Sequence, residues 1–396
     1  MRALCWTGID KLSVETVSDP GVINPHDAIV KVTLSSLCGS DLHLISGFVS
    51  GVRRGDILGH EFVGEIVEIG SSVSKLRIGD RVVVSPVIAC GSCTYCNAGA
   101  WSLCDNSNPS PEFLEKEFGA ITPGIIGFPR AYGGYSGSHA EYVRVPFADA
   151  GAFVIPEDVT NEQAVFISDA FPTGYMAADF ADIRPGDTVA VWGCGAVGLM
   201  AIHSALLLGA GRVIAIDRFP QRLKAASEKA GADTLNYEET DIREALNEIT
   251  GGRGPDRCID AVGMDAHSPT WLYAFRKLKH SFRSDPGASF VLDAAIKSCR
   301  NGGTVAIVGL YQNSIDKFPV GAAISKGLTI KMGLAQAQRY VPVLLDHVKA
   351  RRVDPSYLLT HKLPLDQGPE GYQIFKKRRD ECLRVVFDPC EVVRTF

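Results

Sequence analysis

The sequence predicts an α/β protein of two domains, one built on a partly open β-barrel and the other on a doubly wound parallel sheet. The chain has 396 residues, which is more than one hydrophobic core usually organises. Roughly the first 150 residues carry short β-type runs separated by turns. From about residue 160, short apolar strands alternate with segments of helical period. These three observations together give the fold class.

The β-rich part contains runs of Val and Ile that are bounded by Gly, Pro and Asp. Examples are DAIVKVTLSSL (27–37), VGEIVEIG (63–70) and GDRVVVSP (79–86). Val and Ile favour extended backbone, whereas Gly, Pro and Asp favour turns. We therefore predict antiparallel strands that close into a partly open barrel.

The α/β part contains four short apolar runs separated by segments of helical period. They are TVAVWG (188–193), VIAID (213–217), RCIDAVG (257–263) and TVAIVGL (304–310). Strands that alternate with helices build a parallel sheet with helices on both faces. After about residue 330 the chain returns to mixed strands and helices. We therefore predict that residues 1–168 and 334–396 form the β-rich domain and that residues 169–333 form the parallel one.

Composition and charge argue against several function classes. The formal net charge is −5 and the charges are well mixed, which disfavours a nucleic-acid or acidic-membrane partner. Residues 188–211 carry no charge other than a possible one on His203, but glycines break this stretch into a strand, a turn and a helix rather than one membrane span. Eleven cysteines and no secretion signal indicate a reducing, cytoplasmic environment with free thiols.

A glycine pattern follows the first strand of the parallel domain. Gly193, Gly195 and Gly198 have G-x-G-x-x-G spacing, and Asp217 ends the next strand, 19 residues after Gly198. The first glycine allows a tight turn, the second admits a pyrophosphate, and the third lets the helix pack on the sheet, with the helix N-terminus facing the anion. We predict a dinucleotide site; the alternative is a buried βαβ unit whose glycines serve packing alone.

Asp217 also bears on which dinucleotide binds. Its carboxylate suits the adenosine ribose hydroxyls of NAD and would repel the 2′-phosphate of NADP. Arg218 and Arg222 keep NADP open, because either could pair with that phosphate. The sequence therefore favours NAD.

Four cysteines lie close together in ACGSCTYCNAGAWSLC (89–104), namely Cys90, Cys93, Cys96 and Cys104. A disulfide framework is typical of small secreted chains, and a ferredoxin-type iron–sulfur run ends in Cys-Pro, whereas Asp105 follows the last cysteine here. A nucleic-acid zinc finger needs a basic surface, which this segment lacks. Four thiolates fill a tetrahedral zinc shell, so we predict a structural zinc lobe over residues 89–105 and expect the chemistry elsewhere.

Several motifs occur in an order that is typical of one family. They are CGSDLH (38–43), GHEFVGE (59–65), the four-cysteine lobe, SDAFPTGYMAA (168–178), GCGAVG (193–198) and DAVG (260–263). The combination resembles the zinc-dependent medium-chain alcohol dehydrogenases, and within them glutathione-independent formaldehyde dehydrogenase, over essentially the whole chain. The resemblance implies a GroES-like catalytic domain, a Rossmann NAD-binding domain, two zinc ions per chain, NAD, a small alcohol or aldehyde substrate, and a homo-oligomer, either a dimer or a tetramer.

The resemblance assigns one of these zinc ions to catalysis. Cys38 and His60 are two of its ligands, although each taken alone is more often a buried thiol or a satisfied core histidine. The third ligand in alcohol dehydrogenases is usually a second cysteine, four residues before a TGY, and Asp169 takes that place here; its alternative role is a helix N-cap. A carboxylate donates less electron density than a thiolate, so the metal should be a stronger Lewis acid, with its fourth position open to substrate.

In the reaction that the resemblance implies, hydride moves between a zinc-bound alcohol or aldehyde hydrate and NAD. Ser40 takes the hydroxyl proton, which passes by the nicotinamide ribose to His43, the group of this segment that titrates near neutral pH. Glu61, beside His60, tunes the metal, and Thr173 lies beneath the nicotinamide. The expected cofactor contacts are Gly39, Ser40, His43, Thr173, Gly193, Gly195, Ala196, Val197, Gly198, Asp217, Arg218 and Arg222.

Two segments, 104–141 and 263–302, are longer than a minimal member of the family needs. In glutathione-independent formaldehyde dehydrogenases an insertion after DAVG covers the coenzyme, so we expect tightly held NAD and, with it, aldehyde dismutation. Two other functions stay open. One is a polyol or amino-alcohol dehydrogenase of the same superfamily, and the other is a structural or NAD-sensing protein, which predicts a decayed set of catalytic residues.

Overall fold

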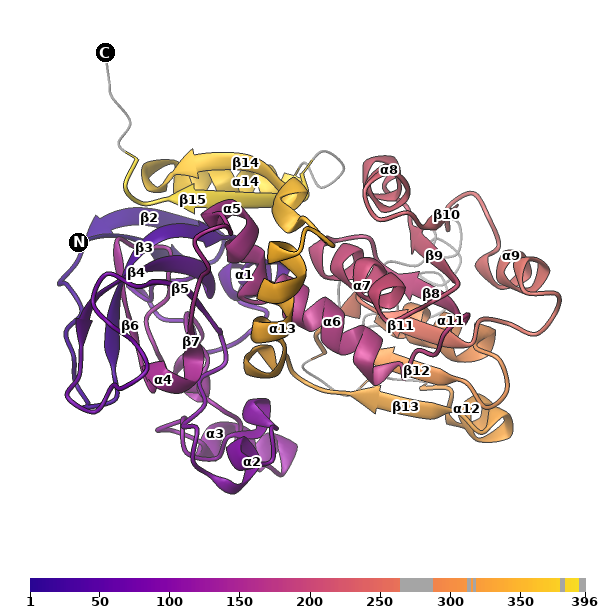
Figure 1. Cartoon of the computed structure of the whole chain (residues 1–396), viewed down its shortest axis with the longest axis horizontal. Helices are drawn as coiled ribbons and strands as arrows, with labels where there is room; N and C mark the ends of the chain where they lie inside the picture. The colour runs from indigo at the N-terminus through magenta and orange to yellow at the C-terminus, as the bar shows by residue number, and fades with distance from the viewer. Residues whose placement is uncertain (264–287, 312–314, 316–317, 378–381, 392–396) are drawn as a thin grey trace, which may run out of the picture. The chain divides into compact units, whose positions relative to one another are not determined.

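The computed structural model describes residues 1–263, 288–311, 315, 318–377 and 382–391. The chain divides into two units (Figure 1). The first unit comprises Met1–Pro172 together with Ala335–Phe396, and the second comprises Thr173–Leu334. The second unit therefore interrupts the first in sequence.

The second unit is built on a parallel sheet. Its described part contains six strands, which pair in the order β10-β9-β8-β11-β12-β13 and all run parallel. This is the strand order of the doubly wound dinucleotide-binding fold, so the predicted fold class is confirmed here. The strands are β8 (Thr188–Trp192), β9 (Arg212–Asp217), β10 (Asp233–Asn236), β11 (Arg257–Asp260), β12 (Thr304–Ile307) and β13 (Thr329–Met332).

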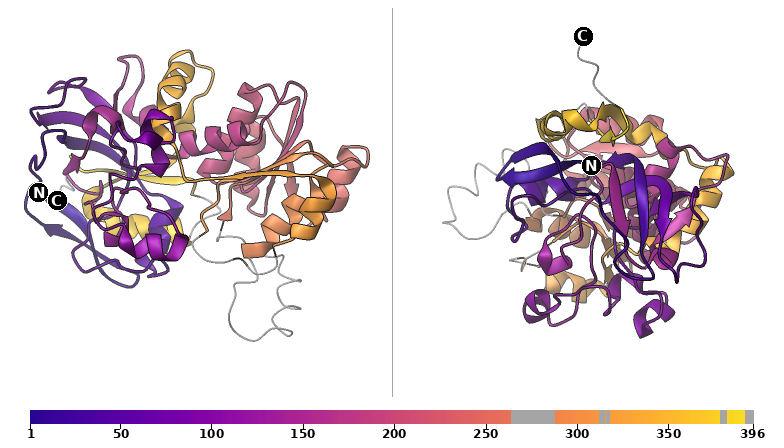
Figure 2. Two further views of the ribbon diagram at one scale, coloured as in Figure 1. Left: turned by 90° about the horizontal axis from the view of Figure 1, so that it is seen from below. Right: turned by 90° about the vertical axis from the view of Figure 1, so that its left-hand side faces the viewer.

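Helices cover both faces of this sheet. In the left view of Figure 2, α11 and α12 lie on the opposite side of the sheet from α7. Strands that are covered on both faces read as continuous apolar runs, which explains why β8 and β9 have so few polar residues. The helices are α6 (Ala170–Phe180), α7 (Ala196–Leu207), α8 (Pro220–Glu228), α9 (Ile242–Ile249), α11 (Ala288–Ser298) and α12 (Val320–Lys326).

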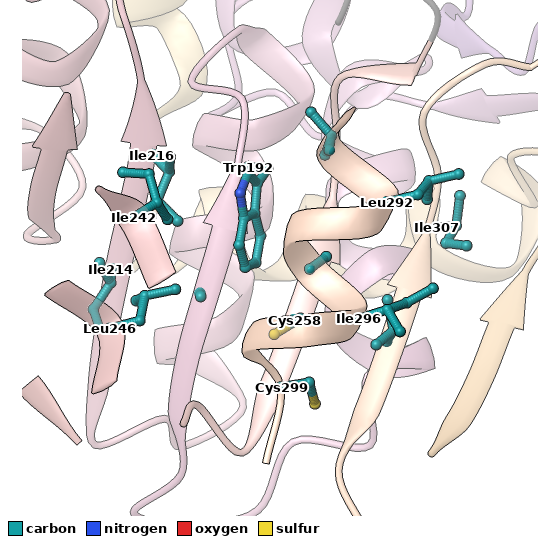
Figure 3. Close-up of a cluster of buried hydrophobic side chains, with 14 residues drawn as sticks. Trp192, Ile214, Ile216, Ile242, Leu246, Cys258, Leu292, Ile296, Cys299 and Ile307 are labelled. Carbon is teal, nitrogen blue, oxygen red and sulfur yellow. The ribbon is translucent and has the colours of Figure 1, made fainter. Parts of the chain in front are cut away.

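The core on the α9 and α11 face is drawn in Figure 3. Trp192 and Ile216 from the sheet pack with Leu246 of α9 and Ile296 of α11. Val191, the neighbour of Trp192, is fully buried as well. Successive side chains of a strand point to opposite faces of the sheet, so both faces contribute to the burial of β8.

The uncharged stretch 188–211 forms β8, a glycine turn and α7, as predicted. Gly193 has a positive φ of 93°, and α7 begins three residues later, at Ala196. None of the helices in the described ranges has both the length and the apolar character that a bilayer span requires.

The first unit is built mainly on antiparallel strands, as predicted. In its described part, one sheet has the order β14-β15-β3-β4-β5-β7 with β6 paired to β3, and β1 and β2 form a separate hairpin. The exception is the β14–β15 pair, which is parallel. The strands are β1 (Arg2–Gly8), β2 (Lys11–Thr16), β3 (Ala28–Ser36), β4 (Glu61–Ile69), β5 (Arg81–Val84), β6 (Tyr142–Val145), β7 (Ala152–Val154), β14 (Leu359–Pro364) and β15 (Arg384–Asp388).

Short helices connect these strands, and the barrel core fills with side chains such as Val30, Phe62 and Val82. The α-helices are α1 (Gly39–Ile45), α2 (Thr94–Asn97), α3 (Glu112–Phe118), α4 (Ala148–Gly151), α5 (Asn161–Ala164), α13 (Ala337–Lys349) and α14 (Gly368–Lys377). The 3₁₀ helices are η1 (Trp101–Leu103), η2 (Arg130–Tyr132), η3 (Val165–Ile167), η5 (Pro355–Leu358) and η6 (Leu365–Gln367).

The division between the units differs by a few residues from the one expected. The predicted boundary separates residue 168 from Asp169, whereas the first unit continues to Pro172. The reason is local bonding: the Ser168 hydroxyl donates to the Val84 carbonyl and accepts from the Phe62 N–H at 3.2 Å. These bonds hold the segment against β4 and β5. These tertiary hydrogen bonds cannot be predicted from the local sequence pattern.

The two long segments differ in how far the structure describes them. Residues 104–141 contain α3 and η2 and are described throughout. Of the segment 263–302, residues 264–287 lie outside the described ranges, so the expected insertion over the coenzyme lies there too. The described remainder of that segment forms α11 and the turn after it.

Candidate functional site

The four cysteines of the lobe at residues 89–105 form a compact sulfur cluster. Their four Sγ atoms all lie within 4.8 Å of one another, and two of the separations, Cys90 to Cys96 and Cys93 to Cys104, are 4.0 Å. A disulfide needs sulfurs about 2.05 Å apart, and all four thiols are free. A tetrahedron with Zn–S bonds of about 2.3 Å has edges of about 3.8 Å. The cluster therefore fits one zinc ion.

Backbone amides orient these sulfurs. The Cys90 N–H donates to the Cys104 sulfur at 3.3 Å, and the Cys93 N–H donates to the Cys90 sulfur at 3.3 Å. Cys93 is also the N-cap of α2 and accepts from the Cys96 N–H at 3.5 Å. Amide donors favour the thiolate form of cysteine. With four sulfur donors around one centre, no position is open for a substrate.

The second donor group lies at the junction of β3 and β4. These strands pair antiparallel, with Ser36 opposite Glu61. Cys38 follows Ser36 by two residues and is the N-cap of α1, and His60 directly precedes Glu61. The strand register therefore places a thiol and an imidazole side by side although they are far apart in sequence.

Asp169 joins this group through the residue before it. Ser168 is fixed to Phe62 of β4 and to Val84 of β5 by its hydroxyl. The carboxylate of Asp169 then lies 3.6 Å (Oδ2) from His60 Nε2. Asp169 also directly precedes α6, so a place at a helix start and a place in the donor group coexist.

Glu61, which the sequence analysis expected to tune the metal rather than bind it, lies among the possible metal ligands. Ligand atoms of Cys38, His60, Glu61 and Asp169 all lie within 4.8 Å of one another. Each ring nitrogen of His60 lies near a different carboxylate: Nε2 is 3.6 Å from Asp169 Oδ2, and Nδ1 is 3.3 Å from Asp41 Oδ1. A carboxylate on the far nitrogen orients a ligating imidazole and raises its basicity. Nε2 is therefore the nitrogen available to a metal.

Glu61 and Arg384 form a buried ion pair beside the group. Glu61 Oε1 accepts from Arg384 Nη2 at 3.1 Å, and both side chains are almost fully buried, at 0% and 3% exposed. Within the described residues, Glu61 Oε2 is buried without a hydrogen-bond partner. A buried, unpartnered carboxylate oxygen is costly. A divalent cation held by Cys38, His60 and Asp169 would lie close to this oxygen and offset its negative charge, so the donor set fits zinc.

The same charges shift the acidity of the group. Burial raises the pKa of Cys38, but Arg384 and His60 outweigh it and lower the pKa to about 7. Burial raises the pKa of Glu61 well above its usual value, against the lowering effect of Arg384. The thiolate is the form that binds metal. The surroundings of Cys38 favour that form.

Three residues near this group were not predicted from the sequence as functional candidates: Asp41, His139 and Arg384. His139 shares a hydrogen bond of 2.8 Å with Ser35, its Nε2 lies 3.9 Å from Asp41 Oδ2, and burial lowers its pKa to about 4. Asp41 lies inside the CGSDLH motif and could have been singled out. Arg384 is an arginine within an apolar strand, RVVFD, which is a usable signal. His139 has no such signal.

Ser40 and His43, predicted to move a proton, both lie on α1. Ser40 Oγ is 3.4 Å from His60 Nε2, so it borders the donor group. His43 lies in the last turn of α1, and its ring centroid is 5.6 Å from that of Phe48. Gly39 is the first residue of the helix. These three predicted cofactor contacts belong to the first unit, and Thr173 and the other predicted contacts belong to the second.

The glycine turn of the second unit has three glycines in three different environments. Gly193 has φ 93°, which favours glycine. A Cβ on Gly195 would have open space, with the nearest heavy atom 3.9 Å away, whereas a Cβ on Gly198 would collide with the Gly193 carbonyl oxygen at 1.7 Å. The free space lies at the N-terminus of α7, where Ala196 and Val197 follow. This cradle fits a dinucleotide pyrophosphate.

Asp217 ends β9 next to this turn. Its carboxylate accepts from the N–H groups of Cys194, Arg218 and Phe219, at 2.7, 2.7 and 3.1 Å. A carboxylate offers about four acceptor positions, so about one remains for a ribose hydroxyl. The guanidinium groups of Arg218 and Arg222 each lie within about 5 Å of the Phe219 ring centroid, at 4.8 Å and 5.0 Å.

Comparisons with known proteins show which family the chain belongs to. Two family descriptions match: "Alcohol dehydrogenase GroES-like domain" over residues 24–157 and "Zinc-binding dehydrogenase" over residues 196–280. A zinc-type alcohol dehydrogenase-like protein of Bacillus subtilis is 38% identical, covering 98% of this chain and 100% of the relative. A formaldehyde dismutase of Pseudomonas putida is 32% identical, covering 95% of each chain. The structure of an alcohol dehydrogenase from Thermus sp. ATN1 has a TM-score of 0.82 and 34% identity, covering 98% of this chain and 99% of that one.

Proposed function

This chain belongs to the zinc-dependent alcohol dehydrogenase family, and we propose that it is an NAD-dependent enzyme that oxidises alcohols or aldehyde hydrates. In this reaction the substrate carbon gives a hydride to NAD⁺, the substrate hydroxyl gives up a proton, and a carbonyl forms. The observation that carries the proposal is the convergence of Cys38, His60 and Asp169 on one centre. With Cys38, His60 and Asp169 as its three ligands, zinc would keep a fourth position for a substrate.

Zinc held by Cys38, His60 and Asp169 supplies a Lewis acid that polarises the substrate oxygen. The chain's own residues then do the rest. The Asp41 carboxylate lies 3.3 Å from Nδ1 of His60, where it favours a ring orientation with Nε2 toward the metal, and the Arg384 guanidinium offsets the carboxylate charge of Glu61. Glu61 thereby shapes the field at the donor group without being consumed in the reaction.

Ser40 is the proposed first acceptor of the substrate proton. Its hydroxyl borders the donor group, 3.4 Å from His60 Nε2. Since a serine hydroxyl both donates and accepts, it can pass a proton on without becoming charged. His43, three residues later on α1, is the proposed next acceptor, because imidazole titrates near neutral pH.

The second unit is proposed to hold NAD. The open space at Gly195, the N-terminus of α7 and the Asp217 carboxylate support this proposal. Asp217 favours NAD over NADP because a 2′-phosphate would meet a carboxylate. Thr173, which is largely buried at the start of α6, is proposed to lie beneath the nicotinamide.

Formaldehyde hydrate is one proposed substrate, and its support is the likeness to the formaldehyde dismutase of Pseudomonas putida. Dismutation needs NAD that stays bound while one aldehyde is oxidised and a second is reduced. The measurement is aldehyde turnover without added NAD, together with NAD released on denaturation. Strict dependence on added NAD would exclude dismutation and leave the dehydrogenase proposal intact.

The experiment that tests the proposal is NAD reduction by the zinc-loaded protein with formaldehyde, methanol, longer alcohols and polyols. We expect NADH formation with at least one class and loss of it in Asp169→Ala. The matched control is Asp158→Ala, which removes an exposed carboxylate of the same unit. Turnover of polyols alone would identify a polyol dehydrogenase. No NAD reduction with any alcohol, although both donor groups carry zinc, would refute the proposal.

A further inference from the structure

A pocket of about 490 Å³ lies within the first unit. Two loop segments line most of it, residues 51–58 and residues 127–136, and Pro109 and Ser110 complete the lining. Its size falls within the range of about 300–1,000 Å³ that is usual for small-molecule sites. A one-carbon aldehyde would leave most of this space empty. The pocket therefore has room for substrates larger than formaldehyde hydrate.

The two walls are fixed to one another by backbone hydrogen bonds. The Gly137 N–H donates to the Ile57 carbonyl and the His139 N–H to the Leu58 carbonyl, both at 2.9 Å. A Cβ on Gly127 would lie 2.3 Å from the Gly59 carbonyl oxygen, so the segments approach as closely as their backbones allow. The backbone of the fold therefore fixes the shape of the pocket.

The pocket borders the donor group of Cys38, His60, Glu61 and Asp169. Phe128 lines the pocket, and its ring makes an edge-on contact with the His60 ring, with centroids 5.5 Å apart. Leu58 also lines the pocket and precedes His60 by two residues. The pocket and the donor group are therefore neighbours that meet at Phe128, while Cys38, His60 and Asp169 are not themselves part of the lining.

The pocket carries more positive than negative charge. Arg53 and Arg130 both line it, and among the described residues neither guanidinium forms an ion pair with a carboxylate. Asp56 is the carboxylate of the lining, and its Oδ2 accepts from the Arg53 backbone N–H at 2.8 Å. Two cations against one engaged carboxylate favour an anionic ligand.

Local structure constrains the backbone at both arginines, whose side chains are exposed. Arg53 begins a turn that closes with the Asp56 N–H donating to the Arg53 carbonyl at 3.0 Å. Arg130 is the first residue of η2, which ends at Gly133 with a positive φ of 96°. The Gly133 N–H donates to the Arg130 carbonyl at 2.9 Å. The backbones that present the two guanidinium groups are therefore constrained.

We infer that this pocket receives the part of the substrate beyond the reacting carbon, and that this part ends in an anionic group, a carboxylate or a phosphate, bound by Arg53 and Arg130. The inference rests on the proposed function. The hydroxyl end of the substrate reaches the donor group, its carbon chain packs on Phe128, and its anionic end meets the guanidinium groups. Arginine binds planar or tetrahedral oxyanions through two parallel N–H donors.

A kinetic experiment tests this inference with three substrates, γ-hydroxybutyrate, hydroxybutyl phosphate and uncharged butanol. We expect kcat/KM to be at least about tenfold higher for one of the anions than for butanol. Arg53→Ala and Arg130→Ala should each lower that value about tenfold for the anion and leave butanol unchanged. Arg54→Ala is the control, because Arg54 is an exposed neighbour that is not part of the lining. The preferred anion shows whether the anionic end of the substrate is a carboxylate or a phosphate.

A binding experiment gives a second readout. Calorimetry with inorganic phosphate on the zinc-loaded protein should show binding that is lost in the Arg53→Ala/Arg130→Ala double variant and kept in Arg54→Ala. Arg130→Lys, which keeps the charge but not the paired donors, should bind at an intermediate level. Equal kcat/KM for butanol and the anions, or equal phosphate binding by the double variant, would overturn the inference.

The two readouts separate this inference from the proposed function. If butanol is oxidised but the arginine variants behave like the parent, the function stands and the anionic substrate is wrong. If no alcohol is oxidised, the proposed function fails and the substrate assignment fails with it. Phosphate binding that depends on both arginines would then show only that the pocket is an anion site.

Discussion

The two donor groups of the first unit differ in almost every physical respect. The lobe gathers Cys90, Cys93, Cys96 and Cys104 from one stretch of 15 residues. The other group takes Cys38, His60, Glu61 and Asp169 from segments that are more than 100 residues apart at the extreme. In the lobe, backbone amides stabilise the sulfurs. In the other group, Arg384 and His60 lower the pKa of the single sulfur, that of Cys38.

This contrast teaches what each group is suited to. Local, identical donors with amide hydrogen bonds complete a metal shell by themselves, and a complete shell stabilises a loop. Mixed donors from distant segments come together only when the barrel has folded, and Arg384 then offsets part of their negative charge. Such a group depends on the fold rather than creating it. It is also the group with a pocket beside it.

The largest effect should come from His60→Ala. Loss of the imidazole should empty the catalytic group and lower kcat/KM about a thousandfold or more, because Lewis-acid stabilisation is worth several kcal/mol. The lobe should keep its zinc. Metal analysis together with NAD reduction measures both outcomes.

The matched control for this prediction is His26→Ala. His26 is an exposed histidine of the same unit, and its ring stacks on that of Phe147 with centroids 6.3 Å apart. It should leave both metal content and turnover unchanged. If His60→Ala keeps full zinc content and full activity, the catalytic assignment of this group is wrong.

Cys93→Ser, a variant of the lobe, should lower stability and leave activity nearly unchanged. Loss of a metal site costs several kcal/mol of folding free energy, which corresponds to a fall in Tm of roughly 10 °C. Turnover per folded molecule should fall less than twofold, because the lobe offers no open position. Calorimetric unfolding and metal analysis measure the effect. Cys390→Ser, which changes an exposed thiol outside both groups, is the control, and an equal Tm loss there would contradict the prediction.

The difference between the groups also explains what the sequence could predict. The lobe and the glycine turn are local, so spacing alone predicted four sulfurs in one cluster and a strand, a turn and a helix around Gly193. The second group needed the family resemblance, because no spacing rule brings Asp169 to Cys38. Arg384 pairs with Glu61, which is 323 positions away in the sequence, and no local sequence pattern predicts such a pair.

The prediction of the fold was likewise accurate where the signal is local and less accurate elsewhere. Buried strands such as β8 and β9 were predicted because continuous apolar runs mark a covered parallel sheet. The edge strands β10 and β13 were missed, since Asp233–Asn236 and Thr329–Met332 are short and partly exposed. The predicted boundary at Asp169 differs by a few residues from the end of the first unit at Pro172, because the hydrogen bonds of Ser168 are tertiary.

A smaller effect on activity, but a large one on stability, should follow from Arg384→Met. It leaves Glu61 buried without its cation, which costs about 3–5 kcal/mol. The double variant Arg384→Met/Glu61→Gln should recover part of this loss, since the uncompensated charge is gone. Chemical denaturation measures both variants.

The control is an exposed pair of the same unit. Lys376→Met breaks the ion pair with Asp10, whose partners are 39% and 42% exposed, and exposed pairs contribute about 1 kcal/mol or less. If Arg384→Met is no more destabilising than Lys376→Met, the buried pair does not balance the charge of the donor group.

The smallest effect is expected from Asp169→Cys, which makes the catalytic group more like the lobe. A thiolate donates more electron density than a carboxylate, so the metal should stay bound while its Lewis acidity falls, and kcat should drop by about tenfold or less. With cobalt in place of zinc, the thiolate absorption should exceed that of the parent, and the lobe adds the same background to both spectra. Asp169→Ala should instead lose the metal from this group. An unchanged cobalt spectrum in Asp169→Cys would show that residue 169 is not a ligand, and the oxygen donor would then have to be Glu61, the remaining carboxylate of the group.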